Sequence, residues 1–243
     1  MNNKHLQHDG QLIPYEVQHK TAVTRRVHLR VGPDGALLVI APKRMSRRAI
    51  HKMLQERAHK VARFLVDALD RQKELPRCDY IHGEEQLYLG ENFPLEIVAA
   101  RGRSGPAGLV NGCIRICTAD SSPQAVKKQL IAWYRLQAQQ LFSARIEAIS
   151  ENAAWIDGRM PAMRLRKMKR TWGSCSASGV ITLNPRLIRT PPACVDYVIA
   201  HELCHLKEMN HGRAFYALQD ALYPQWAQVR AHLRERAHIY LHE

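Results

Sequence analysis

Residues 197–215 read YVIAHELCHLKEMNHGRAF, and this stretch decides the fold expected around it. His201, Glu202 and His205 form an H-E-x-x-H motif, and His211 follows as a third histidine. On a helix the two motif histidines lie one turn apart on the same face, so both imidazoles can reach one ion. Glu202 stands beside the first histidine and can hold a water molecule without being a ligand itself. The pattern therefore indicates a catalytic metal site.

A short motif of this kind can also occur in an ordinary amphipathic helix whose histidines are hydrogen-bonded in the core. Two features favour a metal instead. Residues 195–200 are apolar, so the helix should be buried, and buried polar side chains need compensation. His211 adds a third nitrogen, which matches the three-ligand, open-position pattern of catalytic zinc.

The spacing of the three histidines is similar to that of the metzincins, which carry a glycine where this chain has Glu208. That glycine permits a sharp turn after the helix. Without it the chain needs either a different turn, with Asn210 in the left-handed region, or a longer helix.

Composition and charge narrow the classes of protein. The 243 residues carry a formal net charge of +14, which favours anionic partners such as nucleotides, nucleic acid or an acidic surface. The first residues lack an apolar h-region and no stretch approaches 18 apolar residues, so we expect neither secretion nor a membrane span. Six cysteines without a C-x-x-C pair predict a reduced, cytoplasmic protein.

The N-terminal third reads as strands and then a helix. Residues 26–31 and 37–40 flank a turn at residues 33–35, which predicts a β-hairpin. Ser46 is placed to cap one long helix that runs to about Leu75. The many lysines and arginines of this region indicate either a solvated helix face or an anion-binding surface.

Two further hairpins and a second long helix are expected in the middle of the chain. The hairpins pair residues 86–89 with 93–98 and residues 109–110 with 113–117, the latter around an Asn-Gly turn. The helix should begin after Ser122, which precedes a proline, and should run to about Ser150.

The helix expected to carry His201, Glu202 and His205 is called the metal helix below. It is preceded by residues 163–187, MRLRKMKRTWGSCSASGVITLNPRL. We expect strands at about 164–168 and 180–183, joined by a loop of small residues, with an edge strand forming a wall of the active site. Ser174 and Cys175 are potential nucleophiles, but nothing nearby in the sequence supplies a paired base. A zinc site also makes a covalent nucleophile unnecessary. The candidates for substrate binding are basic: Arg164, Arg166, Lys167, Lys169, Arg170 and, after the motif, Arg213.

The segments around the motif are expected to be helical. Thr190 should cap the metal helix, with prolines in its first turn. Residues 214–222 form the next helix, and one final amphipathic helix should extend from Trp226 to Tyr240.

Taken together, these pieces resemble the YgjP-like family of predicted metal-dependent hydrolases, which is related to zincin metallopeptidases and more distantly to SprT-like proteins. The resemblance is carried by residues 167–188 and 196–216, and the pieces VIAPKRMSRRAI and YLGENFPLEIV also look like that family. It implies a zincin-like catalytic core with Zn²⁺, held by the three histidines, and a glutamate base, here Glu202. Cys204 and Met209 depart from the family pattern, in which a small residue and a proline are expected.

We therefore expect an α+β protein. Residues 1–120 should form a β-rich region with one long helix, and residues 121–243 a zincin-like helical region. Three functions compete: a zinc peptidase, favoured by the motif; a metal-dependent nucleoside triphosphate pyrophosphatase or phosphohydrolase, favoured by arginines that suit phosphates; and a nucleic-acid-associated metalloprotein. The lack of C-x-x-C pairs counts against the third.

Overall fold

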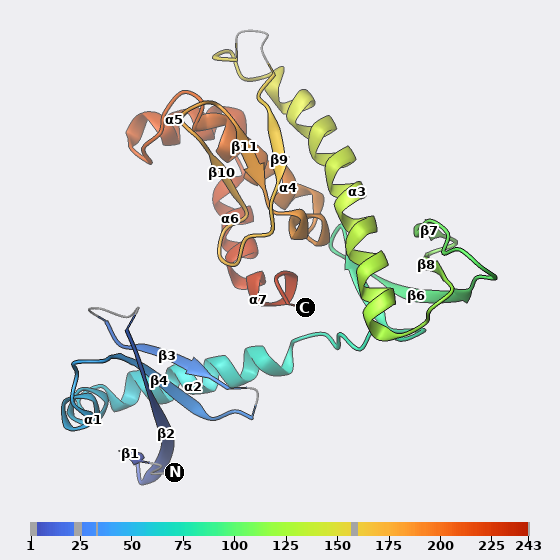
Figure 1. Cartoon of the computed structure of the whole chain (residues 1–243). Helices are drawn as coiled ribbons and strands as arrows, with labels where there is room; N and C mark the ends of the chain where they lie inside the picture. The colour runs from blue at the N-terminus through green and yellow to red at the C-terminus, as the bar shows by residue number, and fades with distance from the viewer. Residues whose placement is uncertain (1–3, 22–25, 33, 157–159, 243) are drawn as a thin grey trace. The chain divides into compact units, whose positions relative to one another are not determined.

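The computed structural model describes residues 4–21, 26–32, 34–156 and 160–242 of an α+β protein (Figure 1). The chain divides into two compact units, residues 1–75 and 76–243, which are described separately below. This division comes earlier than the boundary expected at residue 120. In the described part of the chain, no helix combines the length and apolar character needed to cross a membrane.

The first unit contains a four-stranded sheet in the order β1-β2-β4-β3. Strands β2 and β4 are parallel, and the other neighbours are antiparallel. The predicted hairpin is present as the β3–β4 pair; residue 33 of its turn lies outside the described residues. The strands are β1 (Lys4–His8), β2 (Gln11–Lys20), β3 (His28–Val31) and β4 (Leu37–Pro42).

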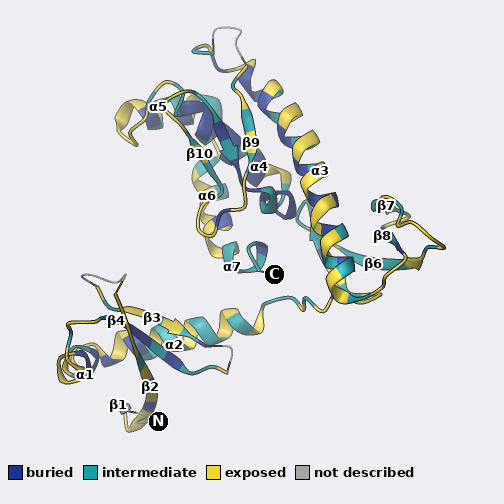
Figure 2. Cartoon of the chain, in the orientation of Figure 1, coloured by how far each residue is buried: buried dark blue, intermediate teal, exposed yellow. Residues whose placement is uncertain are grey.

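The single long helix expected after Ser46 is two helices, α1 (Arg47–Gln55) and α2 (Ala58–Lys73). Ser46 caps the first as predicted, because its Oγ accepts the Ala49 N–H at 3.2 Å. The helix breaks before α2, where Arg57 leaves helical geometry at φ −122° and ψ 25°. Both helices contact β1 and bury side chains in one core, so the bend keeps two apolar faces on a short sheet (Figure 2).

The second unit begins with a sheet in the order β5-β6-β8-β7, and both predicted hairpins are confirmed. Asn111 and Gly112 have φ values of 51° and 75°, as the Asn-Gly turn requires. Leu95, Ile114 and Ile116 belong to the same core as the helices that follow, which explains why this sheet joins the second unit. The strands are β5 (Glu85–Tyr88), β6 (Glu91–Ala99), β7 (Gly108–Val110) and β8 (Cys113–Thr118).

The long helix α3 (Pro123–Ser150) has the predicted bounds, and Ser122 caps it by accepting the Ala125 N–H at 3.4 Å. Its buried face contacts β8, β9 and α4. Figure 1 shows it running along one side of the small sheet and the metal helix. It is therefore the support against which the site is built.

The segment before the metal helix forms a three-stranded sheet in the order β10-β11-β9, where two strands were expected. Strand β9 (Met163–Leu165) is parallel to β11 (Ile181–Leu183), and β10 (Gly173–Cys175) is antiparallel to it. The segment of β10 was expected to be a loop, since its Gly, Ser and Cys have little intrinsic strand preference. Pairing with β11 makes it a strand at the sheet edge.

The helices of the C-terminal part surround the motif. The prediction for residues 214–222 is confirmed by α5, whereas the final helix is broken at Arg236 into α6 and α7. The elements are the 3₁₀ helix η1 (Pro185–Arg189), α4 (Pro192–Cys204), α5 (Arg213–Leu222), α6 (Trp226–Glu235) and α7 (Ala237–Tyr240).

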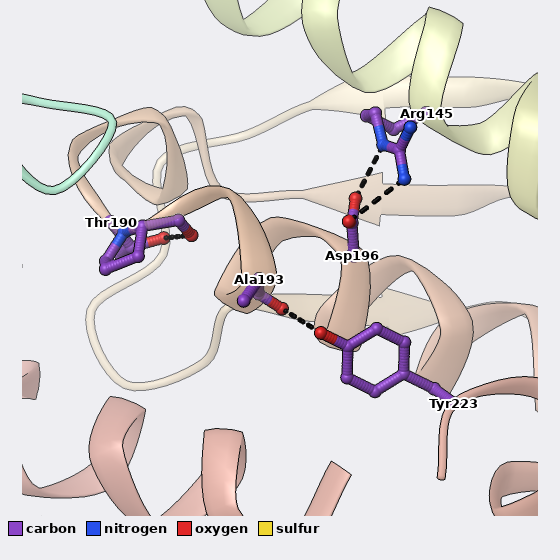
Figure 3. Close-up of polar contacts among 6 residues, drawn as sticks. Arg145, Thr190, Ala193, Asp196 and Tyr223 are labelled. Carbon is purple, nitrogen blue, oxygen red and sulfur yellow. Dashed lines mark hydrogen bonds and ion pairs between the residues drawn. The ribbon is translucent and has the colours of Figure 1, made fainter. Parts of the chain in front are cut away.

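Helix α4 is fixed at its start from two sides (Figure 3). Arg145 of α3 donates two hydrogen bonds to the Asp196 carboxylate, at 2.6 and 2.9 Å. Tyr223, after α5, donates its hydroxyl to the Ala193 carbonyl at 3.2 Å. Thr190 is not the cap that was expected: Pro191 takes that position, and the Thr190 hydroxyl donates to the Leu187 carbonyl at 2.8 Å.

Candidate active site

The structure brings His201, His205 and His211 together at the end of α4. One ligand atom from each ring lies within 4.8 Å of the others. His201 is in the last turn of the helix, His205 is the residue that ends it, and His211 precedes α5. All three rings pack against the fully buried Phe215, with centroid separations of 4.9, 4.7 and 4.6 Å. Phe215 thus forms the floor on which the rings are placed.

The hydrogen bonds of the rings leave their Nε2 atoms facing one another. Nδ1 of His201 donates to the Gln219 amide oxygen at 2.9 Å, and Nδ1 of His205 donates to the Glu208 carbonyl at 3.0 Å. Each proton therefore sits on the outer nitrogen, and the inner nitrogen carries a lone pair.

These inner nitrogens fit a metal ion. The Nε2 atoms of His201 and His211 are 3.0 Å apart. Two lone pairs at this separation repel each other unless a cation or a proton lies between them. Two nitrogens bound to one tetrahedral zinc would be about 3.3 Å apart, given bonds of roughly 2.0–2.1 Å.

Burial keeps the first histidine in its metal-binding form. Burial lowers the pKa of His201 to about 4, against the opposing effect of the Gln219 hydrogen bond, and the nearby charge of Arg230 acts in the same direction as burial. The pKa of His211 is also lowered, again chiefly by burial. Both shifts favour the uncharged ring, which is the form that binds metal.

The turn that returns His211 differs from the glycine turn of the metzincins. Helix α4 ends at Cys204, whose carbonyl accepts the Glu208 N–H at 2.9 Å. The chain then tightens through a bond of 2.7 Å from the Gly212 N–H to the Asn210 carbonyl. Of the two alternatives, the chain makes a different turn and not a longer helix, and Asn210 is not among the described residues with positive φ.

Glu202 is buried beside the histidines with an unused oxygen. Its side chain belongs to a residue only 4% exposed, and no partner for its Oε2 occurs within the described chain. Burial raises the pKa of this carboxyl to about 8. A buried carboxyl group with an unpartnered oxygen beside a set of potential metal ligands is suited to hold a water molecule, and a bound cation would favour the ionised form that accepts its proton.

Strand β10 passes directly over Glu202. A Cβ added to Gly173 would lie 2.5 Å from the Glu202 Oε1 and 2.8 Å from its Cγ, so only glycine fits there. The edge strand and the buried carboxyl group are thereby held in contact. Sequence analysis placed Gly173 in a loop and gave no sign of this approach.

A cavity of about 600 Å³ opens beside this group. Its walls come from α4, from residues 170–173, from α5 and from α6, and His201, Glu202 and His211 are among the residues that line it. The potential metal ligands and the buried carboxyl group are therefore accessible from one space.

Of the basic residues proposed for substrate binding, only Arg170 lines this cavity. Lys167 lines a separate cavity of about 140 Å³, together with Arg186 and Arg189. The remaining candidates are exposed and line neither cavity: Arg164, Arg166, Lys169 and Arg213. The strand expected at about 164–168 ends at Leu165, so Arg166 and Lys169 lie outside it.

Sequence reasoning missed Gln219, Arg230 and Arg234, which also line the cavity. The two arginines are one turn apart on α6, a spacing that places them on one face. That spacing was available in the sequence. What no local pattern supplies is which helix face meets the histidines, since this depends on how α6 packs on α4.

Comparisons with known proteins give a family match and partial structural likenesses. A family model described as "YgjP-like, metallopeptidase domain" matches residues 25–236. The metallopeptidase zymogen of Pyrococcus abyssi abylysin is 21% identical, with a TM-score of 0.36 over 39% of this chain and 93% of that one. The zymogen of Methanocaldococcus jannaschii jannalysin is 16% identical, with a TM-score of 0.34 over 41% and 96%. These partial likenesses carry no functional argument, and no curated protein matches the chain.

Proposed function

The chain belongs to the YgjP-like family of metallopeptidase domains and is a metal-dependent hydrolase of that type, and from this premise we propose that it is a zinc peptidase. His201, His205 and His211 are the proposed ligands. A set of three imidazole nitrogens with room for a further ligand is the arrangement typical of catalytic zinc. The single observation that carries the proposal is the convergence of these three nitrogens beside the unpartnered oxygen of Glu202.

In the proposed reaction, the roles of the protein groups follow from their surroundings. Zinc would supply a Lewis acid that polarises the scissile carbonyl and acidifies water. Glu202 receives a proton from the attacking water and passes it to the leaving amine. Strand β10 covers one side of the Glu202 carboxyl group, and Gln219 holds the ring of His201 in the required orientation.

A peptide substrate is favoured by strand β10. It is an edge strand of its sheet, paired with β11 on one side only within the described residues. An extended peptide can add to such an edge through backbone hydrogen bonds, whatever its side chains are. Because Gly173 of this strand contacts Glu202, a peptide bound along β10 would lie next to the proposed base.

A second candidate is hydrolysis of a nucleoside triphosphate. Arg170, Arg230 and Arg234 line the cavity and could offset the charge of phosphates. This candidate leaves the contact of β10 with Glu202 without a role, so we rank it second. A nucleic-acid-associated function has no comparable feature in its favour.

The test joins metal content to activity. Protein purified without chelator should contain one zinc per chain, lost on His201→Ala and on His205→Ala. Glu202→Gln should retain zinc and lose about 10²-fold or more in hydrolysis of a peptide library. Glu235→Gln, on an exposed residue that does not line the cavity, is the matched control. Full activity of Glu202→Gln, or full zinc retention in both histidine variants, would contradict the proposal.

A further inference from the structure

Three arginines face the cavity of the candidate active site. Arg170 comes from the segment before β10, whereas Arg230 and Arg234 come from one face of α6. Glu202 is the only acidic residue among those that line the cavity, and it is buried at the base of the site. The walls that a substrate would meet are therefore positively charged on two sides.

In the described part of the chain, the charges of these arginines are not compensated by ion pairs. Within the described ranges, none of the three has an acidic side chain at ion-pair distance. Arg230 instead lies over the ring of Trp226, with its guanidinium carbon 5.9 Å from the ring centroid. That contact leaves its N–H groups available to a ligand.

The positive charges of these arginines lie close to the proposed reaction centre. Arg230 lines the same cavity as His201 and His211. Arg170 is three residues from Gly173, which touches the proposed base. An anionic group bound between the two sides would thus lie beside the bond that is cleaved.

We propose that Arg170, Arg230 and Arg234 form a carboxylate-binding subsite, so that the enzyme prefers peptides with an acidic side chain or a free C-terminus next to the scissile bond. The inference rests on the proposed peptidase function. Guanidinium groups bind carboxylates with paired, charge-assisted hydrogen bonds. Phosphates bind arginine equally well, but a peptide also uses the edge of β10, and this combination favours a carboxylate.

A binding experiment tests the subsite without catalysis. Calorimetry on the metal-free protein would compare blocked peptides that carry one glutamate at each successive position with the same peptides carrying glutamine. We expect about tenfold tighter binding of the glutamate peptide at one or two positions. Arg170→Gln, Arg230→Gln and Arg234→Gln should each reduce this preference at least about threefold. Arg164→Gln and Arg213→Gln, which change the net charge equally outside the cavity, should leave it unchanged.

The same peptides with zinc-loaded enzyme separate this inference from the proposed function. If no peptide is cleaved, the peptidase proposal fails, while the binding ratios still decide the subsite. Comparison of free and amidated C-termini distinguishes a terminal carboxylate from a side chain, and a preference for either supports the subsite. Equal binding of glutamate and glutamine peptides, or equal losses in the control variants, would overturn it. Inorganic tripolyphosphate could displace the glutamate peptide at concentrations far lower than those at which the peptide itself binds. If this displacement depends on the same three arginines, the subsite would be reassigned to phosphates.

Discussion

Gly173 is the residue at which the backbone comes closest to the proposed base. A methyl group there would overlap the Glu202 carboxyl group, whose residue is only 4% exposed. Gly173→Ala should therefore displace Glu202 and reduce peptide hydrolysis by about 10²-fold, with zinc content unchanged. Gly108→Ala is the control, since nothing lies within 4 Å of its added Cβ. Normal kinetics for Gly173→Ala would mean that this contact is not needed.

The titration of Glu202 provides a test by stability. Its pKa in the folded, metal-free protein is about 8, raised by burial from the ordinary value of 4.5. Between these values the folded state holds a proton that the unfolded state has released, so stability falls as pH rises from about 4.5 to 8. Glu202→Gln removes this loss. In chelated protein, its free energy of unfolding should exceed that of wild type by roughly 2–4 kcal/mol at pH 9, and the difference should shrink toward pH 5. A difference that does not vary with pH would exclude the raised pKa.

Gln219 is proposed as a positioning residue for the metal site. It is fully buried, and its amide oxygen accepts the Nδ1–H of His201. Gln219→Leu keeps the volume and removes the acceptor, so zinc affinity should fall about 10- to 100-fold in a chelator competition. Gln219→Glu, which keeps an acceptor, should retain more of the affinity than the leucine variant. Gln228→Leu, on an exposed position of α6, is the control; an equal loss there would remove Gln219 from this role.

These residues show why part of the site could be predicted from sequence and part could not. His201, Glu202 and His205 follow from helical spacing alone, because neighbouring turns of one helix fix their geometry. Gln219, Gly173 and Arg230 act across elements, and their positions depend on how α5, β10 and α6 pack on α4. No local pattern records that packing.

At the scale of elements, the ion pair between α3 and α4 sets the position of the metal helix. The Arg145–Asp196 pair is bidentate and partly buried, with side chains 39% and 18% exposed. Asp196→Asn should therefore destabilise the second unit by about 1–2 kcal/mol, a value reduced for the exposure of the arginine. Asp70→Asn breaks an exposed pair with Lys73 and should cost less than about 0.5 kcal/mol. Equal effects of the two substitutions, measured by denaturant unfolding, would show that the α3–α4 pair is only a surface contact.

Elements with strong local signals were predicted well. The Asn111-Gly112 hairpin and the capped helix α3 each carry their own start or turn residues. The failures were of two kinds. The breaks at Arg57 and Arg236 were not predicted, because the apolar periodicity continues across them. Such periodicity indicates which face of a helix is buried, but not whether the helix is continuous. Strand β10 was missed because its three residues become a strand only through pairing with β11.

At the scale of the whole molecule, the two units have separate hydrophobic cores. Ile50 is fully buried in the first core and Ile199, on α4, in the second. Ile50→Ala should destabilise its own unit by about 2–4 kcal/mol. All three potential metal ligands and the cavity beside them lie in the second unit, so zinc affinity should not change. Ile199→Ala, with a similar loss of buried volume next to the histidines, should lower both stability and zinc affinity.

The family model nevertheless spans both units, since it begins at residue 25 and ends at residue 236. The first unit is thus part of the family's architecture although it supplies none of the proposed ligands. Calorimetric unfolding of Ile50→Ala, with zinc titration and peptide kinetics on the same samples, separates two roles for it. Unchanged zinc affinity with reduced hydrolysis would assign the first unit to substrate handling. A fall in zinc affinity would contradict independent cores and would mean that the metal site depends on both units.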